Sequence, residues 1–436
     1  MRFQRNLFLA GATVTVMMCS FLWPAHSCRN NACAISHFYG NEQLQARNSA
    51  YQAPELVYSE QIPATQEPVF KSGEARILRA ESRIGWSYSD ARFVPDCNGD
   101  GWMELALIAR HQVQCGNTVH NGTVALVSGA TQRPIGIYSG WFYFQLKTSA
   151  AGDLLMVHEG LYAEGALQMF DSLRSEPRWE SETIWDEFAF VGDVDGDGIE
   201  DVAVSSPFAS MVVDSENRKV GRVVLLSGAD GRTLWRLDGS EPGVCLGRGL
   251  APAGDRNDDG APDVAAFSYT DVTILSGLDA SQLDRLTFPP EVEIGSVEAV
   301  GDYDGDGFGE FMVTEVRPRR ERRFVVYSSE SWEPIDIGDG WRIQWATEGD
   351  PDGDGVDELI LGRRDPESGE RRISSYSRWG LRDLRTVADD EPEWRGVETA
   401  NAGRFREGEA WQVLLVHPPP LWSMESSGSI DLVPLN

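Results

Sequence analysis

Five short segments of the chain share one nine-residue pattern, and this repetition constrains the fold more than any other feature. Oxygen-bearing side chains stand at positions 1, 3, 5 and 9 of the pattern, and glycine stands at position 6. The five segments begin at Asp96, Asp193, Asp255, Asp302 and Asp350. A repeat of this kind has to be recognised before domains are counted, because it predicts one repetitive architecture for a chain of 436 residues.

The spacing of the pattern suits a calcium ion, which takes six to eight oxygen ligands. A tightly wound loop presents alternate side chains inward, and glycine at position 6 permits the sharp turn because it tolerates positive φ. The carbonyl of position 7 and the carboxylate of position 9 complete the shell. The predicted ligand positions are Asp96, Asn98, Asp100, Trp102, Glu104, Asp193, Asp195, Asp197, Ile199, Asp201, Asp255, Asn257, Asp259, Ala261, Asp263, Asp302, Asp304, Asp306, Phe308, Glu310, Asp350, Asp352, Asp354, Val356 and Glu358. We expect up to five Ca²⁺ ions as the cofactors.

An EF-hand is the obvious competing interpretation of such loops. It requires a bidentate glutamate at position 12 and a helix after the loop. Position 12 is apolar in all five copies: Leu107, Val204, Ala266, Val313 and Leu361. Each loop runs instead into a short apolar segment that is typical of a buried strand. The pattern therefore excludes an EF-hand or a dockerin.

The spacing of the copies reveals two further repeats. The last two steps between first positions are 47 and 48 residues, and the first step, from 96 to 193, is 97 residues. A hidden repeat over 145–157 halves that long step, with Asp153 at position 9 and no acids at positions 1, 3 and 5. Residues 404–416 fit a last repeat that also lacks the acidic residues. The count is then seven repeats, five of which have intact loops.

Each repeat predicts four short antiparallel strands. One strand enters the loop and one leaves it. A third follows, as in 124–129, 223–228, 272–277 and 324–329, and a shorter fourth strand ends the unit. Four strands in about 48 residues are typical of a propeller blade. We therefore expect an all-β chain that forms a seven-bladed β-propeller of four-stranded antiparallel blades. A β-solenoid and a sandwich fit less well, because solenoid coils are shorter and a sandwich does not require evenly spaced loops.

The last repeat ends after its third strand, at 427–436. The segment 74–81 is strand-like and belongs to no repeat, so we predict that it pairs into the last blade and closes the ring. Closure would remove exposed edges and tie the ends of the domain together.

The N-terminus predicts export. Arg2 and Arg5 precede an apolar run over 7–23, and small residues lead to a cleavage site after Ser27. A transmembrane anchor is the alternative, but the run is short and interrupted by Gly11. The predicted organisation is a signal peptide over 1–27, a loose polar leader over 28–70 and the propeller over 71–436. The expected location is periplasmic, at the cell surface, or secreted, with no transmembrane span in the mature chain and a monomeric state.

The formal net charge of −30 indicates which partners to expect. An acidic chain repels nucleic acid, so none is expected as a partner. Eighteen carboxylates fall on the predicted ligand positions. Without cations, each loop holds several like charges a few ångströms apart, at a cost on the order of 1 kcal/mol per pair near a surface. Calcium is therefore expected to stabilise the fold.

The residues 190–209 resemble a blade of the FG-GAP (VCBS) repeat family, which forms the propeller of integrin α-subunits, and 246–255 are similar to the strand that enters such a loop. The resemblance covers roughly 74–436 and implies a seven-bladed propeller with calcium at one face and ligands at the other. Unlike integrin subunits, the chain lacks Phe-Gly before most loops and has no later membrane span, which points to a bacterial exported relative.

Two arginine clusters fall in the predicted connections between second and third strands of the fifth and sixth blades. The sharper interpretation is an anion-recognising patch for an acidic glycan or a carboxylate. The other is a pair of solvated hairpins that balance nearby glutamates. The candidate residues are Arg319, Arg320, Arg322, Arg323, Arg363, Arg364, Arg371 and Arg372.

No nucleophile elbow, phosphate-binding loop or zinc-binding histidine motif occurs in the sequence. The predicted function is a non-catalytic binding or scaffold module for a protein or glycan ligand, with no catalytic residues assigned and calcium in a mainly structural role. The alternative is a calcium-dependent polysaccharide-active enzyme, a lyase or a hydrolase, on the same scaffold.

Overall fold

The computed structural model describes residues 76–79 and, with gaps, residues 86–435; the longest gaps are 160–164, 301–307, 336–341, 352–357, 388–398, 406–410 and 418–428. The regular secondary structure of the described residues is entirely β. The predicted signal peptide and leader, 1–27 and 28–70, lie outside the described residues. Among the described residues no helix has the length and apolar character needed to cross a membrane.

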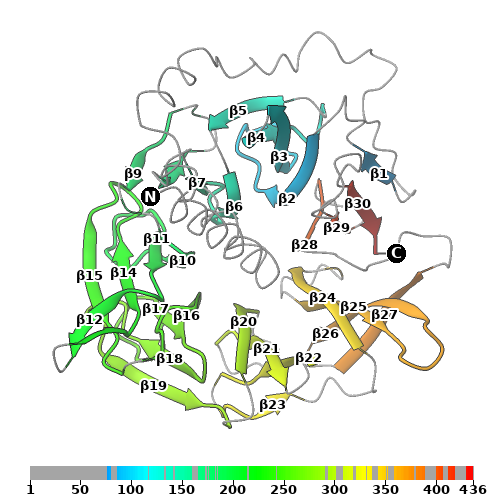
Figure 1. The fold of residues 1–436 in the computed structure, drawn as a ribbon. Coiled ribbons are helices and arrows are strands. Elements are labelled where there is room, and N and C mark those ends of the chain that lie inside the picture. Colours follow the sequence, from blue (N-terminus) through cyan, green and yellow to red (C-terminus); the bar gives the residue numbers. More distant parts are fainter. Residues whose placement is uncertain are drawn as a thin grey trace, which may run out of the picture. The chain divides into compact units, whose positions relative to one another are not determined.

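The described residues form seven four-stranded antiparallel sheets and one two-stranded hairpin (Figure 1). We number the sheets in chain order. Sheet 1 contains β2 (Trp86–Val94), β3 (Glu104–Cys115), β4 (Asn117–Val127) and β5 (Pro134–Gly140). Sheet 2 contains β6 (Tyr143–Thr148), β7 (Leu154–Glu159), β8 (Gly165–Phe170) and β9 (Trp179–Ser181).

Sheet 3 contains β10 (Glu187–Gly192), β11 (Asp201–Ser205), β14 (Arg222–Leu226) and β15 (Thr233–Asp238), and it carries the separate hairpin of β12 (Ser210–Val213) and β13 (Glu216–Lys219). Sheet 4 contains β16 (Gly249–Gly254), β17 (Asp263–Phe267), β18 (Asp271–Leu275) and β19 (Gln282–Thr287).

Sheet 5 contains β20 (Glu293–Ala299), β21 (Phe311–Arg317), β22 (Glu321–Tyr327) and β23 (Pro334–Ile335). Sheet 6 contains β24 (Arg342–Gly349), β25 (Glu358–Arg364), β26 (Arg371–Ser377) and β27 (Gly380–Val387). Sheet 7 contains β28 (Thr399–Gly403), β29 (Gln412–His417), β30 (Ser429–Pro434) and β1 (Arg76–Arg79).

The sheets are arranged as a β-propeller, as the sequence predicted. The first strands β2, β6, β10, β16, β20, β24 and β28 all contribute residues to the lining of one cavity of about 920 Å³. A strand in which apolar and polar residues alternate buries only one face of its sheet. The second strands β11 and β17 are instead buried at every position. A strand buried on both faces lies between two neighbouring layers, which is the position of a strand inside a blade.

Apolar side chains hold each sheet against its neighbours. The buried residues fall into seven clusters, each shared by two sheets. One cluster joins sheet 7 to sheet 1, where Phe405 packs edge-on against Phe93 with ring centroids 5.3 Å apart. The core is therefore divided among the interfaces between sheets, and no single sheet can bury its faces alone.

Tryptophans of the fourth strands add hydrogen bonds to these interfaces. The indole Nε1 of Trp179 in sheet 2 donates to the carbonyl of Gly228 in sheet 3 at 2.8 Å. In the same way, Trp235 in sheet 3 donates to Gly277 in sheet 4 at 2.6 Å. A Cβ at Gly228 or Gly277 would lie 2.0 Å from a backbone carbonyl, so these turns require glycine.

The predicted pairing of an N-terminal strand with the last repeat is confirmed. β1 pairs antiparallel with β30, with Arg76 opposite Leu432 and Arg79 opposite Ser429. β30 pairs in turn with β29, so the two ends of the domain share one sheet. Two repeats lack acids at positions 1, 3 and 5 of the pattern. The strands predicted for them are also present, as β6 and β7 and as β28 and β29.

Loss of β1 should expose the edge of β30 and weaken sheet 7. A chain that starts at residue 82 lacks β1, and we expect it to melt at a lower temperature and to self-associate, because unpaired strand edges pair with other chains. Thermal melting and size-exclusion chromatography provide the measurements. A chain that starts at residue 71 retains β1 and serves as the control; equal stability of the two truncated chains would contradict the prediction.

Candidate functional site

The acidic loops connect the first and second strands of their sheets. The loop that begins at Asp96 joins β2 to β3, the loop at Asp193 joins β10 to β11, and the loop at Asp255 joins β16 to β17. In the first loop, carboxylate oxygens of Asp96, Asp100 and Glu104 lie within 4.8 Å of one another. In the second loop, those of Asp193, Asp195 and Asp197 do the same. The spacing of the pattern thus brings its acids together.

The loops are wound by hydrogen bonds from backbone N–H groups to the acids of positions 1 and 5. In the second loop, the two oxygens of Asp193 accept from Gly196 and Gly198, each at 2.8 Å, and Asp197 accepts from Ile199 at 2.9 Å. Gly198, at position 6, has a φ of +89°. Its equivalents Gly101 and Gly260 have φ of +81° and +90°, so the turn needs glycine for its backbone conformation.

The carboxylate of position 9 connects the loop to its sheet. Asp201 accepts from the N–H groups of Val194 and Asp195 at the start of the loop, at 2.8 and 3.1 Å. Its other oxygen accepts from Gly228 at 2.9 Å, in the turn between the third and fourth strands. Asp263 repeats this arrangement with Arg256 and Gly277. One side chain therefore ties two separate connections to the same end of the sheet.

These ninth-position acids are buried. The relative exposures of Glu104, Asp201 and Asp263 are all 0%. Burial raises the pKa of each of the three carboxyls above its ordinary value, while backbone N–H donors act in the opposite direction and neighbouring loop aspartates add to the rise. A carboxyl whose pKa is higher in the folded protein than in the unfolded chain stabilises the fold at pH values below its pKa in the unfolded chain. That stabilisation is lost as the pH rises through its pKa in the folded protein. A cation beside these carboxyls would offset the cost that burial imposes on their ionised form.

Parts of the fourth and fifth loops lie outside the described residues, which leaves their predicted ligands Asp302, Asp304, Asp306, Asp350, Asp352, Asp354 and Val356 without a structural description. The ninth positions of both loops are described. Glu310 has a relative exposure of 0% and Glu358 of 6%, so they are buried like their counterparts in the first three loops.

Sheet 2 has lost the acids of its loop but keeps the carboxylate of position 9. Asp153 pairs there with Arg178, whose Nη1 and Nη2 lie 3.2 and 3.0 Å from its two oxygens. Arg178 stands just before the fourth strand β9, and both side chains are mostly buried. A guanidinium matches a carboxylate in this two-point manner. Sequence reasoning did not identify Arg178; the only signal available was a basic residue directly before a fourth strand.

The structure places the candidate arginines in different environments. Arg319 and Arg320 lie outside the described residues. Arg322 and Arg323 belong to β22, where they pair with Val316 and Glu315 of β21. Arg363 and Arg364 lie at the end of β25, opposite Arg372 and Arg371 of β26. The described arginines of both clusters thus lie in the paired ends of the second and third strands, next to the second-to-third connections, at the end of sheets 5 and 6 remote from the acidic loops.

Arg363 is engaged inside sheet 6. Its side chain is 3% exposed, and its Nε and Nη2 donate to Ser374 Oγ at 2.9 and 2.8 Å. Nη2 also donates to Asp383 Oδ1 at 2.6 Å. Arg372 donates to the other oxygen of Asp383 and to Glu370. Burial would raise the pKa of Asp383, but hydrogen bonds from Ser374 and Arg372 and the charges of both arginines hold this pKa below its ordinary value.

The fold and the loops define a β-propeller with acidic, glycine-wound connections at one end of its blades. Residues 188–226, which include the second loop, match the FG-GAP repeat family. The match extends from β10 through β14 and covers the loop described above.

Two further comparisons describe what the chain is similar to. Among solved structures, rhamnogalacturonan lyase YesW matches with a TM-score of 0.44 at 12% sequence identity, over 84% of this chain and 74% of the lyase chain. The comparison with curated proteins found no matching relative.

Substitution Arg363→Ala should destabilise the protein. It removes a buried guanidinium that donates to Ser374 Oγ and to Asp383 Oδ1, while Arg372 and Ser374 still donate to Asp383, at a cost of about 1–3 kcal/mol in the free energy of unfolding. Urea unfolding measures this cost, and Arg364→Ala, one residue along β25, is the control with the smaller expected loss. If Arg363→Ala unfolds like the unchanged protein, the guanidinium has no structural role and is available to a ligand.

Proposed function

We propose that this protein is an exported calcium-binding β-propeller that acts as a non-catalytic binding or scaffold module for a protein or glycan ligand. In this proposal calcium is structural and recognition occurs at the opposite end of the blades. The observation that supports the proposal most strongly is the set of converging carboxylates in the first and second loops, together with the buried ninth acid that ties the loop to its sheet.

The donor chemistry of the loops fits calcium. The side chains at the ligand positions of the first three loops offer oxygen only from carboxylates and from the amides of Asn98 and Asn257. Hard oxygen donors select calcium or magnesium over the metals that prefer thiolate or imidazole. Three or four carboxylates in a loop favour calcium, because magnesium requires a strict octahedron and retains several waters.

Bound calcium would supply positive charge where several carboxylates meet. The residues of the chain do the remaining work: glycine at position 6 turns the loop, and the ninth acid holds the loop against the turn between the third and fourth strands. That turn also carries the glycine whose carbonyl receives a tryptophan from the preceding sheet. A cation in the loop therefore stiffens the interface between two sheets as well as the loop itself.

We further propose that the seven sheets are the blades of one closed ring. Each of the seven buried clusters joins two neighbouring sheets, and the one between sheets 7 and 1 completes the circuit. The pairing of β1 with β30 gives the last sheet its fourth strand. A closed ring would leave no sheet face without a partner.

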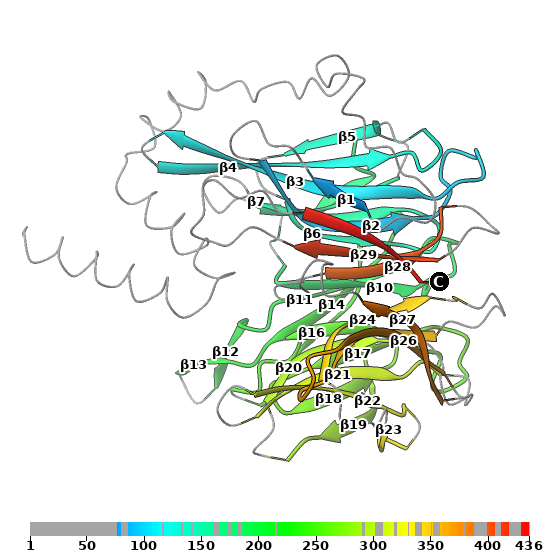
Figure 2. The same cartoon turned by 90° about the vertical axis from the view of Figure 1, so that its right-hand side faces the viewer.

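The end of the blades remote from the acidic loops offers an extended surface. β3 and β4 remain paired from Gln112 opposite His120 to Cys115 opposite Asn117, beyond the ends of their pairing with β2 and β5. In sheet 3 the corresponding connection forms the extra hairpin β12–β13. Both hairpins project on the same side in Figure 2. Such extensions are not required to complete a blade, and they support recognition at this end.

The organisation proposed with this function is a signal peptide over 1–27, a leader over 28–70 and the propeller over 71–436, with export to the periplasm, the cell surface or the medium. The proposed state is a monomer, and nucleic acid is not a proposed partner because the net charge is −30.

Calcium should raise the melting temperature of the protein, and chelation should lower it. At about 100 times the dissociation constant, each bound ion adds about 2.7 kcal/mol to the free energy of unfolding. Differential scanning calorimetry with calcium or with a chelator measures the shift, which we expect to be several degrees. A melting temperature that chelation leaves unchanged would sink the proposal.

The variant Asp197→Asn sharpens this test because it removes one ligand charge and retains the oxygen that accepts from Ile199. We expect it to reduce the calcium-induced shift. Asp279→Asn removes the same charge from an exposed turn of sheet 4 outside the ligand positions, where Oδ1 accepts from Ser281. This control should keep the full shift.

A glycan array combined with an assay for newly formed reducing sugar separates binding from catalysis. We expect binding without turnover for a recognition module. Calcium-dependent turnover of a bound polysaccharide would overturn the non-catalytic proposal and establish the enzyme alternative.

A further inference from the structure

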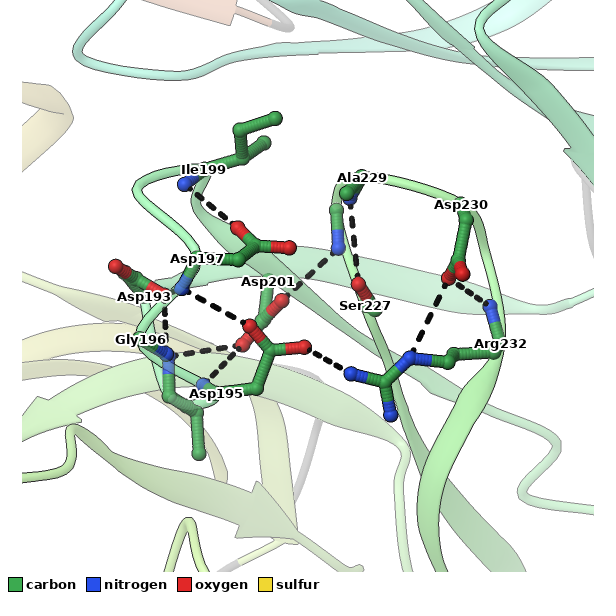
Figure 3. A network of polar contacts seen from close by, with 12 residues as sticks. Asp193, Asp195, Gly196, Asp197, Ile199, Asp201, Ser227, Ala229, Asp230 and Arg232 are labelled. Atoms are coloured by element: carbon green, nitrogen blue, oxygen red, sulfur yellow. Dashed lines mark hydrogen bonds and ion pairs between the residues drawn. The ribbon is translucent and has the colours of Figure 1, made fainter.

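A cationic side chain from outside the second loop contacts one of its acids. Arg232 Nη2 lies 2.7 Å from Asp195 Oδ2, and Figure 3 shows the guanidinium reaching from the neighbouring turn to the loop. Arg232 also lies near Asp230, with its Nε 3.7 Å from Oδ1 of that residue. Asp195 is the third position of the acidic pattern and its side chain is 13% exposed, so the contact is shielded from water on the acid's side.

The contact involves one specific oxygen of Asp195. Oδ1 accepts from the backbone N–H of Asp197 at 3.2 Å, and Oδ2 pairs with Arg232. The first and third loops use the same backbone bond, from Asp100 to Asn98 Oδ1 and from Asp259 to Asn257 Oδ1. The oxygen that faces the loop is thus held by the loop itself in all three cases, and Arg232 is not needed to orient it.

The three loops differ in what the second polar atom of the side chain at position 3 contacts. Asn98 Nδ2 donates to Glu104 Oε1 at 2.6 Å, and Asn257 Nδ2 donates to Asp259 Oδ2 at 2.8 Å. Asp195 cannot donate, and its loop holds four acidic ligand side chains where the first and third loops hold three. Arg232 supplies a positive charge from outside, which returns the net charge at the ligand positions of the second loop to that of the other two.

Sheet 2 contains a parallel arrangement. Arg178 and Arg232 both lie between the third and fourth strands of their sheets, and each reaches the connection between the first and second strands. In sheet 2 the loop has lost its other acids, and Arg178 provides the positive charge for the remaining Asp153. An arginine of this turn therefore already serves as the cation of a loop in this chain.

We propose that Arg232 is a built-in counter-cation of the second loop, which holds the loop folded without calcium and lowers its affinity for the ion by competing for Asp195. This inference rests on the proposed function, since it requires the loop to bind calcium. Binding of a dication beside the guanidinium must overcome charge repulsion and release the ion pair. Among the three intact loops that the structure describes, the second should then be the one that empties at the smallest cost in stability.

The experiment compares Arg232→Ala with Arg236→Ala in the full chain. Arg236 lies on β15 of the same sheet and pairs with Asp238 at 2.8 Å, so its loss removes the same charge at a position outside the loop. Calcium is titrated against a competing chelator to resolve the binding steps, and melting is recorded with chelator alone. For Arg232→Ala we expect one step to tighten about tenfold and the calcium-free melting temperature to fall. For Arg236→Ala the binding steps should be unchanged.

Asp195→Asn assigns the effect to this loop. In that background the ion pair no longer exists and only the repulsion between the guanidinium and the dication remains, so adding Arg232→Ala should tighten calcium binding less than it does in the natural chain. Unchanged or weaker calcium binding by Arg232→Ala in the otherwise natural chain would overturn the inference, because it would make Arg232 neutral or a group that supports binding. Absence of calcium binding by the unchanged protein and by every variant would instead reject the proposed function and the inference together.

Discussion

The buried carboxylate at the ninth position of each loop is the constraint on which the rest of the site depends. Asp201 and Asp263 accept backbone N–H groups from the start of the loop and from the turn between the third and fourth strands, so one side chain joins two connections that are far apart in the sequence. Burial of an acid is costly unless hydrogen bonds and cations balance it. The glycine turns, the converging aspartates and the nearby arginines are all consequences of placing that charge at the end of a β-sheet.

Arginine side chains supply positive charge at this end of two neighbouring sheets. Arg178 pairs with Asp153 in sheet 2, and Arg232 pairs with Asp195 beside an intact loop. The same end carries the Trp179 and Trp235 hydrogen bonds that join neighbouring sheets. The turns that contain Gly228 and Gly277 therefore couple the charge balance of the loops to the packing between the sheets. An ion bound in a loop would affect the loop and the interface between the sheets.

The sequence predicted the strands and loops well because both depend on local spacing. The acids at fixed positions, the apolar segments after them and the glycine at position 6 act within nine residues, and even the degenerate repeat at 145–157 could be found from the period. The arginines were harder to interpret. Arg363 reads as part of an exposed basic cluster in the sequence, yet it is buried against Ser374 and Asp383, because cross-strand register decides which side chains meet. No sequence pattern identified Arg178 or Arg232.

The sequence by itself determined the repeat, the positions of the oxygen-bearing side chains in the loops, the all-β class and the pairing of an N-terminal strand with the last sheet, since each of these follows from periodicity along the chain. Only the tertiary structure decided which charges neutralise one another. Asp195 and Arg232 are 37 residues apart, and they meet because two connections of an antiparallel sheet lie at the same end. Contacts between such connections follow from strand pairing in three dimensions, and no spacing within a single loop specifies them.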